Sequence, residues 1–125
     1  MRVLLDTQVL YLAASASGLR QKVRVILENP DNDRLISSAS ILEIALKHMS
    51  GKIEMPENVV RQAVEDLGLS IMAFEPRHAY QLFSLPLHHR DPFDRMIIAT
   101  AIAEDIPLIG GDRKFARYSG LQRIW

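Results

Sequence analysis

Two aspartates stand three residues apart at the start of an apolar stretch, HRDPFDRMIIATAIAE (residues 89–104). Asp91 followed by Pro92 has the pattern of a helix N-cap and a first helical residue, and Asp94 then fills the acidic position of a capping box. Both carboxylates could serve only the helix, by accepting its free N–H groups and offsetting its dipole. They could also point into a site that binds a cation. The positions of the other acids bear on which interpretation holds.

Other acids stand where a parallel sheet would present them to a ligand. Asp6 and Asp112 each follow a short apolar run typical of a buried strand, and Glu43 lies in the first turn of a predicted helix. Ligands of open α/β sheets bind outside the carboxyl ends of the strands. If these ends converge, three or four carboxylates share one pocket and repel one another unless something neutralises them. Mg²⁺ and Mn²⁺ prefer such ligands, and they activate water for phosphodiester cleavage.

Each of these acids also has a purely structural interpretation. Asp6 and Asp112 could cap the short helices that follow them. Ser40 and Glu43 match the S-x-x-E capping box, and Glu43 with Lys47 makes a favourable i,i+4 pair. These interpretations compete with the shared pocket, which requires the acids to converge.

The elements that must position the acids alternate between strands and helices. Strands are predicted at 3–5, 34–37, 69–74, 107–109 and 122–125. Helices are predicted at 8–14, 19–27, 40–49, 56–67, 76–85 and 92–104, with a turn at 15–18 and a short basic helix after Asp112. This alternation predicts an α/β fold with a mainly parallel sheet. The chain has no repeat, low-complexity tract or linker, so we expect one domain over residues 1–125.

Composition is ordinary for a soluble globular protein, with 48% hydrophobic and 24% charged residues among 125. The absence of cysteine excludes a disulfide framework and a Cys-based zinc site. The start of the chain does not resemble a signal peptide, and the longest apolar run, residues 96–103, is too short to span a bilayer. We therefore expect a cytoplasmic protein that does not enter a membrane.

A net charge of zero gives no global attraction to nucleic acid, so any such role needs a local basic patch. The candidate patches are Arg77 with His78, the run 88–90 with Arg95, and Arg113 with Lys114 and Arg117. Each could equally be a solvated face. Thr7 and Arg95 could contact phosphate or orient ligands, and Arg95 could instead pair with Asp91 or Glu43.

Four segments in order, LLDTQVLYL, SSASILEIALK, HRDPFDRMIIATA and LIGGDRKFARY, resemble the PIN-domain ribonucleases, and most closely the VapC-type toxins of bacterial toxin–antitoxin pairs. The likeness covers nearly the whole chain. It implies a three-layer α/β/α fold, cleavage of RNA that depends on Mg²⁺ or Mn²⁺, inhibition by a cognate antitoxin, and a homodimer.

Carried over by position, the resemblance implies that the metal-binding and catalytic acids are Asp6, Glu43, Asp94 and Asp112. Asp94 matches the third acid of the family because an apolar helix follows it directly. Asp91 would then be the cap, although the two roles could be reversed if the helix begins later.

The chain departs from the family pattern at three places. Relatives often carry His where Gln8 stands, Trp where Leu42 stands, and Thr or Ser where Gly110 and Gly111 precede the last acid. The first two departures leave the carboxylates intact. The two glycines could loosen the position of Asp112.

Other functions fit the residues less well. A haloacid-dehalogenase phosphatase needs a second Asp two residues after Asp6, where Gln8 stands, and a response-regulator receiver needs an acidic pair before its phosphorylated Asp. The alternative from a different class is an inert PIN-fold module that only binds a protein partner. Retention of all four acids favours the enzyme. The sequence does not identify the RNA.

Overall fold

The computed structural model describes residues 1–15 and 18–125, and its centre is a parallel β-sheet. The strands are β1 (Arg2–Leu5), β2 (Asp33–Ser37), β3 (Ser70–Met72), β4 (Leu108–Ile109) and β5 (Arg123–Ile124). They lie in the order β3-β2-β1-β4-β5, and each pair of neighbours is parallel. The predicted parallel α/β sheet is therefore confirmed. The turn predicted at 15–18 includes residues 16 and 17, which lie outside the described residues.

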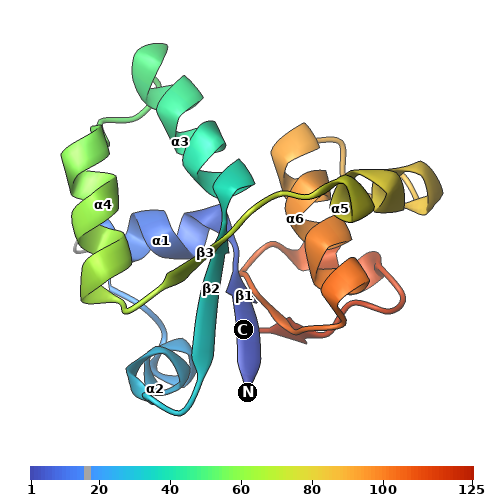
Figure 1. Ribbon diagram of the computed structural model, residues 1–125, viewed down its shortest axis with the longest axis horizontal. Helices are drawn as coiled ribbons and strands as arrows, with labels where there is room; N and C mark the ends of the chain where they lie inside the picture. The colour runs from blue at the N-terminus through green and yellow to red at the C-terminus, as the bar shows by residue number, and fades with distance from the viewer. Residues whose placement is uncertain (16–17) are drawn as a thin grey trace.

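Helices cover both faces of the sheet. They are α1 (Thr7–Ala14), α2 (Gln21–Glu28), α3 (Ser38–Met49), α4 (Glu57–Asp66), α5 (Pro76–Gln81) and α6 (Pro92–Glu104). Figure 1 shows α1 to α4 on one side of the strands and α5 and α6 on the other, which gives the expected three layers. Within the described residues, no helix has the length and apolar character needed to cross a membrane.

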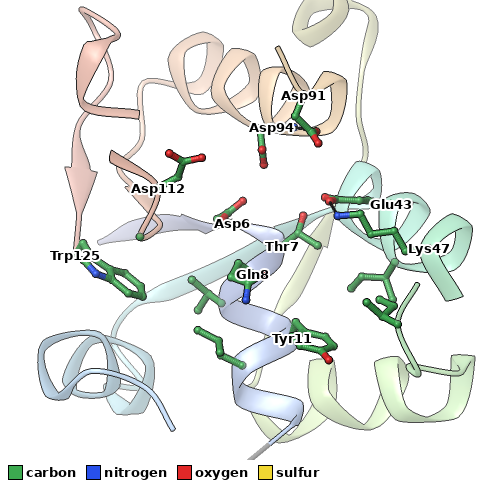
Figure 2. Close-up of a pocket in the computed structure, with 15 residues that line it drawn as sticks. Asp6, Thr7, Gln8, Tyr11, Glu43, Lys47, Asp91, Asp94, Asp112 and Trp125 are labelled. Atoms are coloured by element: carbon green, nitrogen blue, oxygen red, sulfur yellow. Dashed lines mark hydrogen bonds and ion pairs between the residues drawn. The ribbon is translucent and has the colours of Figure 1, made fainter. Parts of the chain in front are cut away.

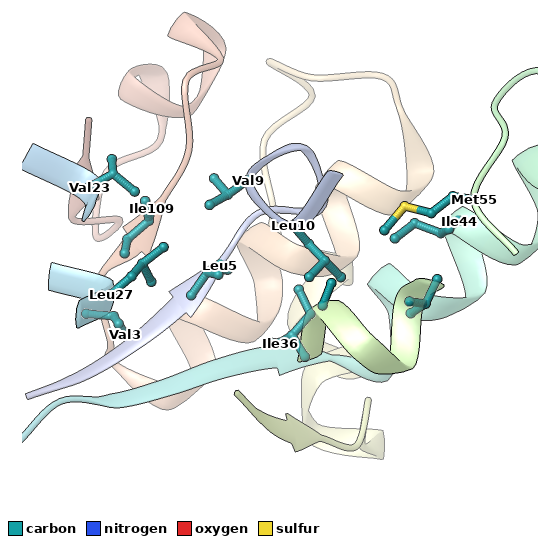
Figure 3. Close-up of a cluster of buried hydrophobic side chains, with 12 residues drawn as sticks. Val3, Leu5, Val9, Leu10, Val23, Leu27, Ile36, Ile44, Met55 and Ile109 are labelled. Carbon is teal, nitrogen blue, oxygen red and sulfur yellow. The ribbon is translucent and has the colours of Figure 1, made fainter. Parts of the chain in front are cut away.

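Successive residues of each strand point to opposite faces, so each strand contributes to two separate cores. Val3 and Leu5 of β1 point toward α1 and α2, where they pack with residues of all four helices on that side (Figure 3). Leu4 points the other way and packs with Ile97 and Ile98 of α6. All five side chains are fully buried. Apolar side chains on both faces explain why β1 is a continuous apolar run in the sequence.

The predicted helix at 76–85 is shorter than expected. Helix α5 ends at Gln81, and a 3₁₀ turn (Leu82–Ser84) carries the chain to Leu85, which is extended with ψ of 122°. A proline disfavours helical geometry in the residue before it, so Pro86 accounts for the extended conformation of Leu85. The short basic helix after Asp112 is likewise a 3₁₀ helix, Arg113–Arg117.

Strands β1 and β4 lie side by side at the point where the strand order reverses, because the strands after β1 extend the sheet first on one side of it and then on the other. The N–H of Asp6, just past β1, donates to the carbonyl of Ile109 at the end of β4 (2.9 Å). The segments that follow β1 and β4 therefore leave the sheet next to each other, at its carboxyl edge. In open α/β sheets this topological switch point is where ligands bind.

Candidate metal centre

A pocket of about 430 Å³ lies at this switch point, and all four predicted acids line it. Asp6 follows β1, Glu43 lies on α3, Asp94 lies on α6 and Asp112 follows β4. Figure 2 shows the carboxylates of Asp6, Asp94 and Asp112 directed toward a common space, with Glu43 at its side near α3. Acids separated by up to 106 positions in the chain thus converge at the carboxyl edge of the sheet.

Asp6 is not explained by helix capping. It occupies the N-cap position of α1, but its side chain makes no capping hydrogen bond. It is 5% exposed, and its Oδ1 is buried without a hydrogen-bond partner among the described residues. Burial, together with the charges of Asp94 and Glu43, raises its pKa from an ordinary 3.8 to about 7. Such a carboxylate is held in the fold at a cost unless a cation is bound nearby.

The capping box predicted for Ser40 and Glu43 is wrong. Helix α3 begins at Ser38, and the hydroxyl of Ser37 caps it by accepting the N–H of Ala39 (3.0 Å). Ser40 is buried inside the helix, where its hydroxyl accepts a hydrogen bond from Thr7 Oγ1 (2.8 Å). This contact ties the first turn of α3 to the start of α1, so it helps to hold Glu43 near Asp6.

Glu43 is also buried, at 5% exposed. Lys47 Nζ donates to its Oε2 (2.6 Å), which is the predicted i,i+4 pair, and this hydrogen bond raises the pKa of Lys47. The second oxygen, Oε1, is buried and has no hydrogen-bond partner among the described residues. One half of this carboxylate is therefore free to bind something that the pocket holds.

The two aspartates of α6 have different surroundings. Asp91 is the N-cap, and its Oδ1 accepts the N–H groups of Phe93 (2.9 Å) and Asp94 (3.0 Å). Asp94 lies in the first turn and directs its carboxylate toward Asp6 and Asp112 (Figure 2). Burial, with the neighbouring charge of Asp91, raises the pKa of Asp94 to about 6. The helix begins where the capping pattern predicts, so both aspartates line the pocket, with Asp91 as the cap and Asp94 directed toward the other acids.

Asp112 is fixed by its neighbours in spite of the glycines before it. Its Oδ1 accepts the N–H of Lys114 (2.9 Å), as the capping interpretation predicts, and its Oδ2 lies 2.7 Å from His89 Nε2. Burial alone would raise the pKa of Asp112, but these two hydrogen bonds outweigh it and lower the pKa. The expected loosening is therefore not seen.

His89 and Arg95 do not form a solvated basic face. His89 is 6% exposed, and its Nε2 lies between Asp94 and Asp112. The guanidinium of Arg95 donates to the carbonyls of Leu85 (3.2 Å) and Pro86 (3.0 Å), so the ion pair suggested for it with Asp91 or Glu43 is wrong. Local sequence patterns could not identify His89, because its partner Asp112 is 23 positions away.

The residues present fit a hard divalent cation. The pocket offers carboxylate oxygens, which Mg²⁺ and Mn²⁺ prefer. Two of these oxygens, on Asp6 and Glu43, are buried without hydrogen-bond partners among the described residues. Lys47 neutralises Glu43, but Asp6 has no ion-pair partner among the described residues, and a buried anion of this kind needs one. The pKa values of Asp6 and Asp94 are raised because both carboxylates are buried close to other acids.

Comparisons with solved structures agree with this fold. Similar structures include VapBC2 from Rickettsia felis bound to a DNA fragment from the promoter, with a TM-score of 0.76 and 20% identity over 100% of this chain and 99% of that chain. DNA-bound VapBC from Salmonella typhimurium gives a TM-score of 0.74 and 18% identity over 99% and 97%. VapBC-5 from Mycobacterium tuberculosis gives 0.62 and 18% over 98% and 97%.

Sequence comparisons give the family directly. A search of curated proteins finds no match. The family model described as PIN domain matches residues 3–121, nearly the whole chain, and the chain therefore belongs to the PIN domain family.

Proposed function

We propose that this chain is a Mg²⁺- or Mn²⁺-dependent endoribonuclease and the toxin of a toxin–antitoxin pair. The observation that carries the proposal is the convergence of four acids in one pocket, where Asp6 Oδ1 and Glu43 Oε1 are buried without partners among the described residues. Structural relatives named as VapBC complexes support the toxin assignment.

In this proposal Asp6, Glu43, Asp94 and Asp112 hold the ion. When bound, such an ion lowers the pKa of a bound water and stabilises charge that develops on the scissile phosphate. The buried positions of Asp6 and Glu43 keep bulk water from screening that charge. Lys47, which also lines the pocket, adds a positive charge beside the acids for an incoming phosphate.

A protein partner is supported by apolar side chains exposed on α3. Leu42 and Leu46 are 48% exposed and Met49 is 80% exposed, and such surface commonly marks an interaction site. We propose a cognate antitoxin and a second copy of this chain as partners. Light scattering on the purified protein tests the homodimer, and a monomeric mass at all concentrations would contradict it.

RNA cleavage by the purified protein tests the enzyme. Varied single-stranded RNAs and structured substrates such as tRNA are incubated with Mg²⁺ or Mn²⁺, with EDTA and the Asp94→Asn variant as controls. Asp66→Asn, an exposed acid on α4 remote from the acids of the pocket, serves as a matched control for loss of one carboxylate. We expect cleavage by the wild type and Asp66→Asn, and none with EDTA or with Asp94→Asn.

A binding measurement separates the two candidate functions if no RNA is cut. Titration calorimetry with Mn²⁺ shows whether the wild type binds the ion. Binding without cleavage would leave the substrate in question. Absence of both would contradict the nuclease and favour an inert PIN-fold module that only binds a protein.

A further inference from the structure

The imidazole of His89 joins two sides of the acidic pocket. Its Nε2 lies 2.7 Å from Asp112 Oδ2 and 3.0 Å from Asp94 Oδ2. Asp94 comes from the first turn of α6 and Asp112 from the segment after β4. These two carboxylates would repel each other if nothing lay between them. The ring nitrogen of His89 lies between them and contacts both.

Three further contacts fix the ring in this place. The backbone N–H of His89 donates to the hydroxyl of Tyr118 (2.7 Å). The ring packs against Phe115, with ring centroids 6.1 Å apart. The N–H of Asp91 donates to Nδ1 (3.2 Å). The residue is 6% exposed, so the surrounding residues leave the ring few alternative positions.

The hydrogen bond at Nδ1 determines which nitrogen carries the proton. Nδ1 accepts the backbone N–H of Asp91, so its lone pair is in use and the ring proton is on Nε2. Nε2–H then donates to Asp112 Oδ2, and Asp94 Oδ2 lies 3.0 Å from the same nitrogen. His89, Asp94 and Asp112 offer ligand atoms within 4.8 Å of one another, which is close enough for one ion. A protonated nitrogen has no lone pair for a metal, however, so the geometry assigns His89 a donor role.

We propose that His89 is a positioning residue, which holds Asp94 and Asp112 together through Nε2–H and so shapes one side of the cation site. The inference rests on the proposed metal-dependent function. The hydrogen bond from Nε2 goes to Asp112 Oδ2, and the contact with Asp94 also falls on a single oxygen, its Oδ2. Groups that orient metal ligands in this way typically change metal affinity by about 10–100-fold when removed.

Two polar substitutions distinguish the hydrogen-bond donor at Nε2 from the acceptor at Nδ1. In His89→Gln, the side-chain amide reaches the place of Nε2 and can donate to the carboxylates. In His89→Asn, the shorter amide lies near the place of Nδ1, where it can accept the Asp91 N–H but cannot reach them. His88→Ala is the matched control, because His88 is the exposed neighbour that contacts Tyr118 instead of the pocket.

Mn²⁺ affinity, measured by calorimetry, is the first readout. We expect His89→Asn to bind Mn²⁺ about 10–100-fold more weakly than the wild type, with most of the affinity recovered in His89→Gln and none lost in His88→Ala. Urea unfolding of all variants checks that each is folded. Equal affinity in the wild type and His89→Asn would overturn the positioning role and leave the metal site standing. A wild type that binds no Mn²⁺ would overturn the metal site itself, and the positioning role with it.

The second readout is measured on the wild type, so its outcome does not depend on how tightly a variant binds the metal. Nitrogen-15 NMR of labelled histidine reports which ring nitrogen carries the proton, with His89→Gln used to assign the signal. We expect the Nε2–H form both without metal and with saturating Mg²⁺. Loss of the Nε2 proton when Mg²⁺ is added would show that His89 is a ligand and would overturn the proposal.

Discussion

At the scale of single residues, Asp91 and Asp94 show how two identical side chains take different roles. Asp91 lies just outside α6, where its carboxylate reaches two free N–H groups of the first turn. Asp94 lies three residues later, where its backbone N–H donates to Asp91 and its carboxylate points into the pocket. The spacing that makes a capping motif is thus also the spacing that delivers an acid to the site.

This division predicts different results for the same substitution. Asparagine caps a helix about as well as aspartate, so Asp91→Asn should keep the helix start and most of the metal-dependent cleavage. Asp94→Asn removes a charge from the site itself and should abolish cleavage. Initial rates of RNA cleavage at saturating Mn²⁺ measure both. An equal loss of activity in the two variants would contradict the assignment of Asp91 as a cap.

The stability of the two variants gives an independent check. Asp91→Ala removes the cap, and we expect it to lower the free energy of unfolding by about 0.5–2 kcal/mol. Asp94→Asn relieves repulsion among the acids and should not lower stability in EDTA. Urea denaturation measures both free energies.

At the scale of elements, the turn after β4 depends on two residues without side chains. A Cβ on Gly110 would lie 2.6 Å from Phe115 Cε2 and 3.1 Å from Asp6 Cβ. A Cβ on Gly111 would lie 2.8 Å from Trp125 Cζ2. The glycines therefore let the strand end lie close to β1 and to the C-terminal strand. Instead of loosening Asp112, they permit the close approach of the two strand ends, which places Asp112 in the same pocket as Asp6.

We expect Gly110→Ala to destabilise the protein by about 1–3 kcal/mol, the usual cost of overpacking. It should also weaken Mn²⁺ binding, since the added methyl group presses on Asp6. Phe115→Leu makes room for the added methyl group and should relieve the loss of stability. The free-energy changes of Phe115→Leu and Gly110→Ala should therefore be less than additive in a double-mutant cycle. Additive free energies of unfolding would show that the two sites do not interact.

Most of the elements could be predicted because their signals are local. The apolar run before Asp6 predicts β1, and the cap at Asp91 with Pro92 predicts the start of α6. The wrong capping prediction at Ser40 depends on a distant contact. Ser40 is not a cap because its hydroxyl is bonded to Thr7, 33 positions away. A capping motif in a sequence cannot show that its hydroxyl has found another partner.

The site was predictable in part for the same reason. The four acids stand at strand ends and helix starts, which position alone indicates, and the structure brings them into one pocket. His89 has no such signal, since nothing in the run 88–90 distinguishes a buried histidine from an exposed one. Its burial follows from Phe115 and Tyr118, which come from the segment after β4. Only the folded chain places them together.

At the scale of the whole molecule, a net charge of zero conceals a strongly uneven distribution. Four acids and Asp91 gather at one pocket, so their mutual repulsion opposes folding at that place. A cation bound there should stabilise the fold by mass action. Mn²⁺ at one hundred times its dissociation constant should add about 2.7 kcal/mol to the free energy of unfolding. Thermal unfolding with Mn²⁺, against NaCl of equal ionic strength, measures this, and Asp6→Asn should show little of the gain.

The same repulsion predicts how stability depends on pH when metal is absent. The pKa of Asp6 rises from an ordinary 3.8 to about 7 on folding, so the folded protein binds this proton more tightly than the unfolded chain. The stability it contributes is fully present below about pH 4 and is lost as the pH rises toward 7. Asp94, with a pKa raised to about 6, acts in the same direction. The lowered pKa of Asp112 makes stability rise with pH, but this effect lies at a lower pH than the effects of Asp6 and Asp94.

Urea unfolding in EDTA, between about pH 5 and pH 8, tests this at the level of the whole fold. We expect wild-type stability to fall with rising pH, and Asp6→Asn to remove much of that slope. The variant should exceed the wild type near pH 8 by on the order of a few kcal/mol. Comparing the two proteins cancels the titration of groups that the substitution does not affect. Saturating Mn²⁺ should reverse the order, because it favours the ionised acids that only the wild type retains in full. Parallel curves for the two proteins in EDTA would mean that Asp6 is not held at a cost, and would remove the main physical reason for a cation in this pocket.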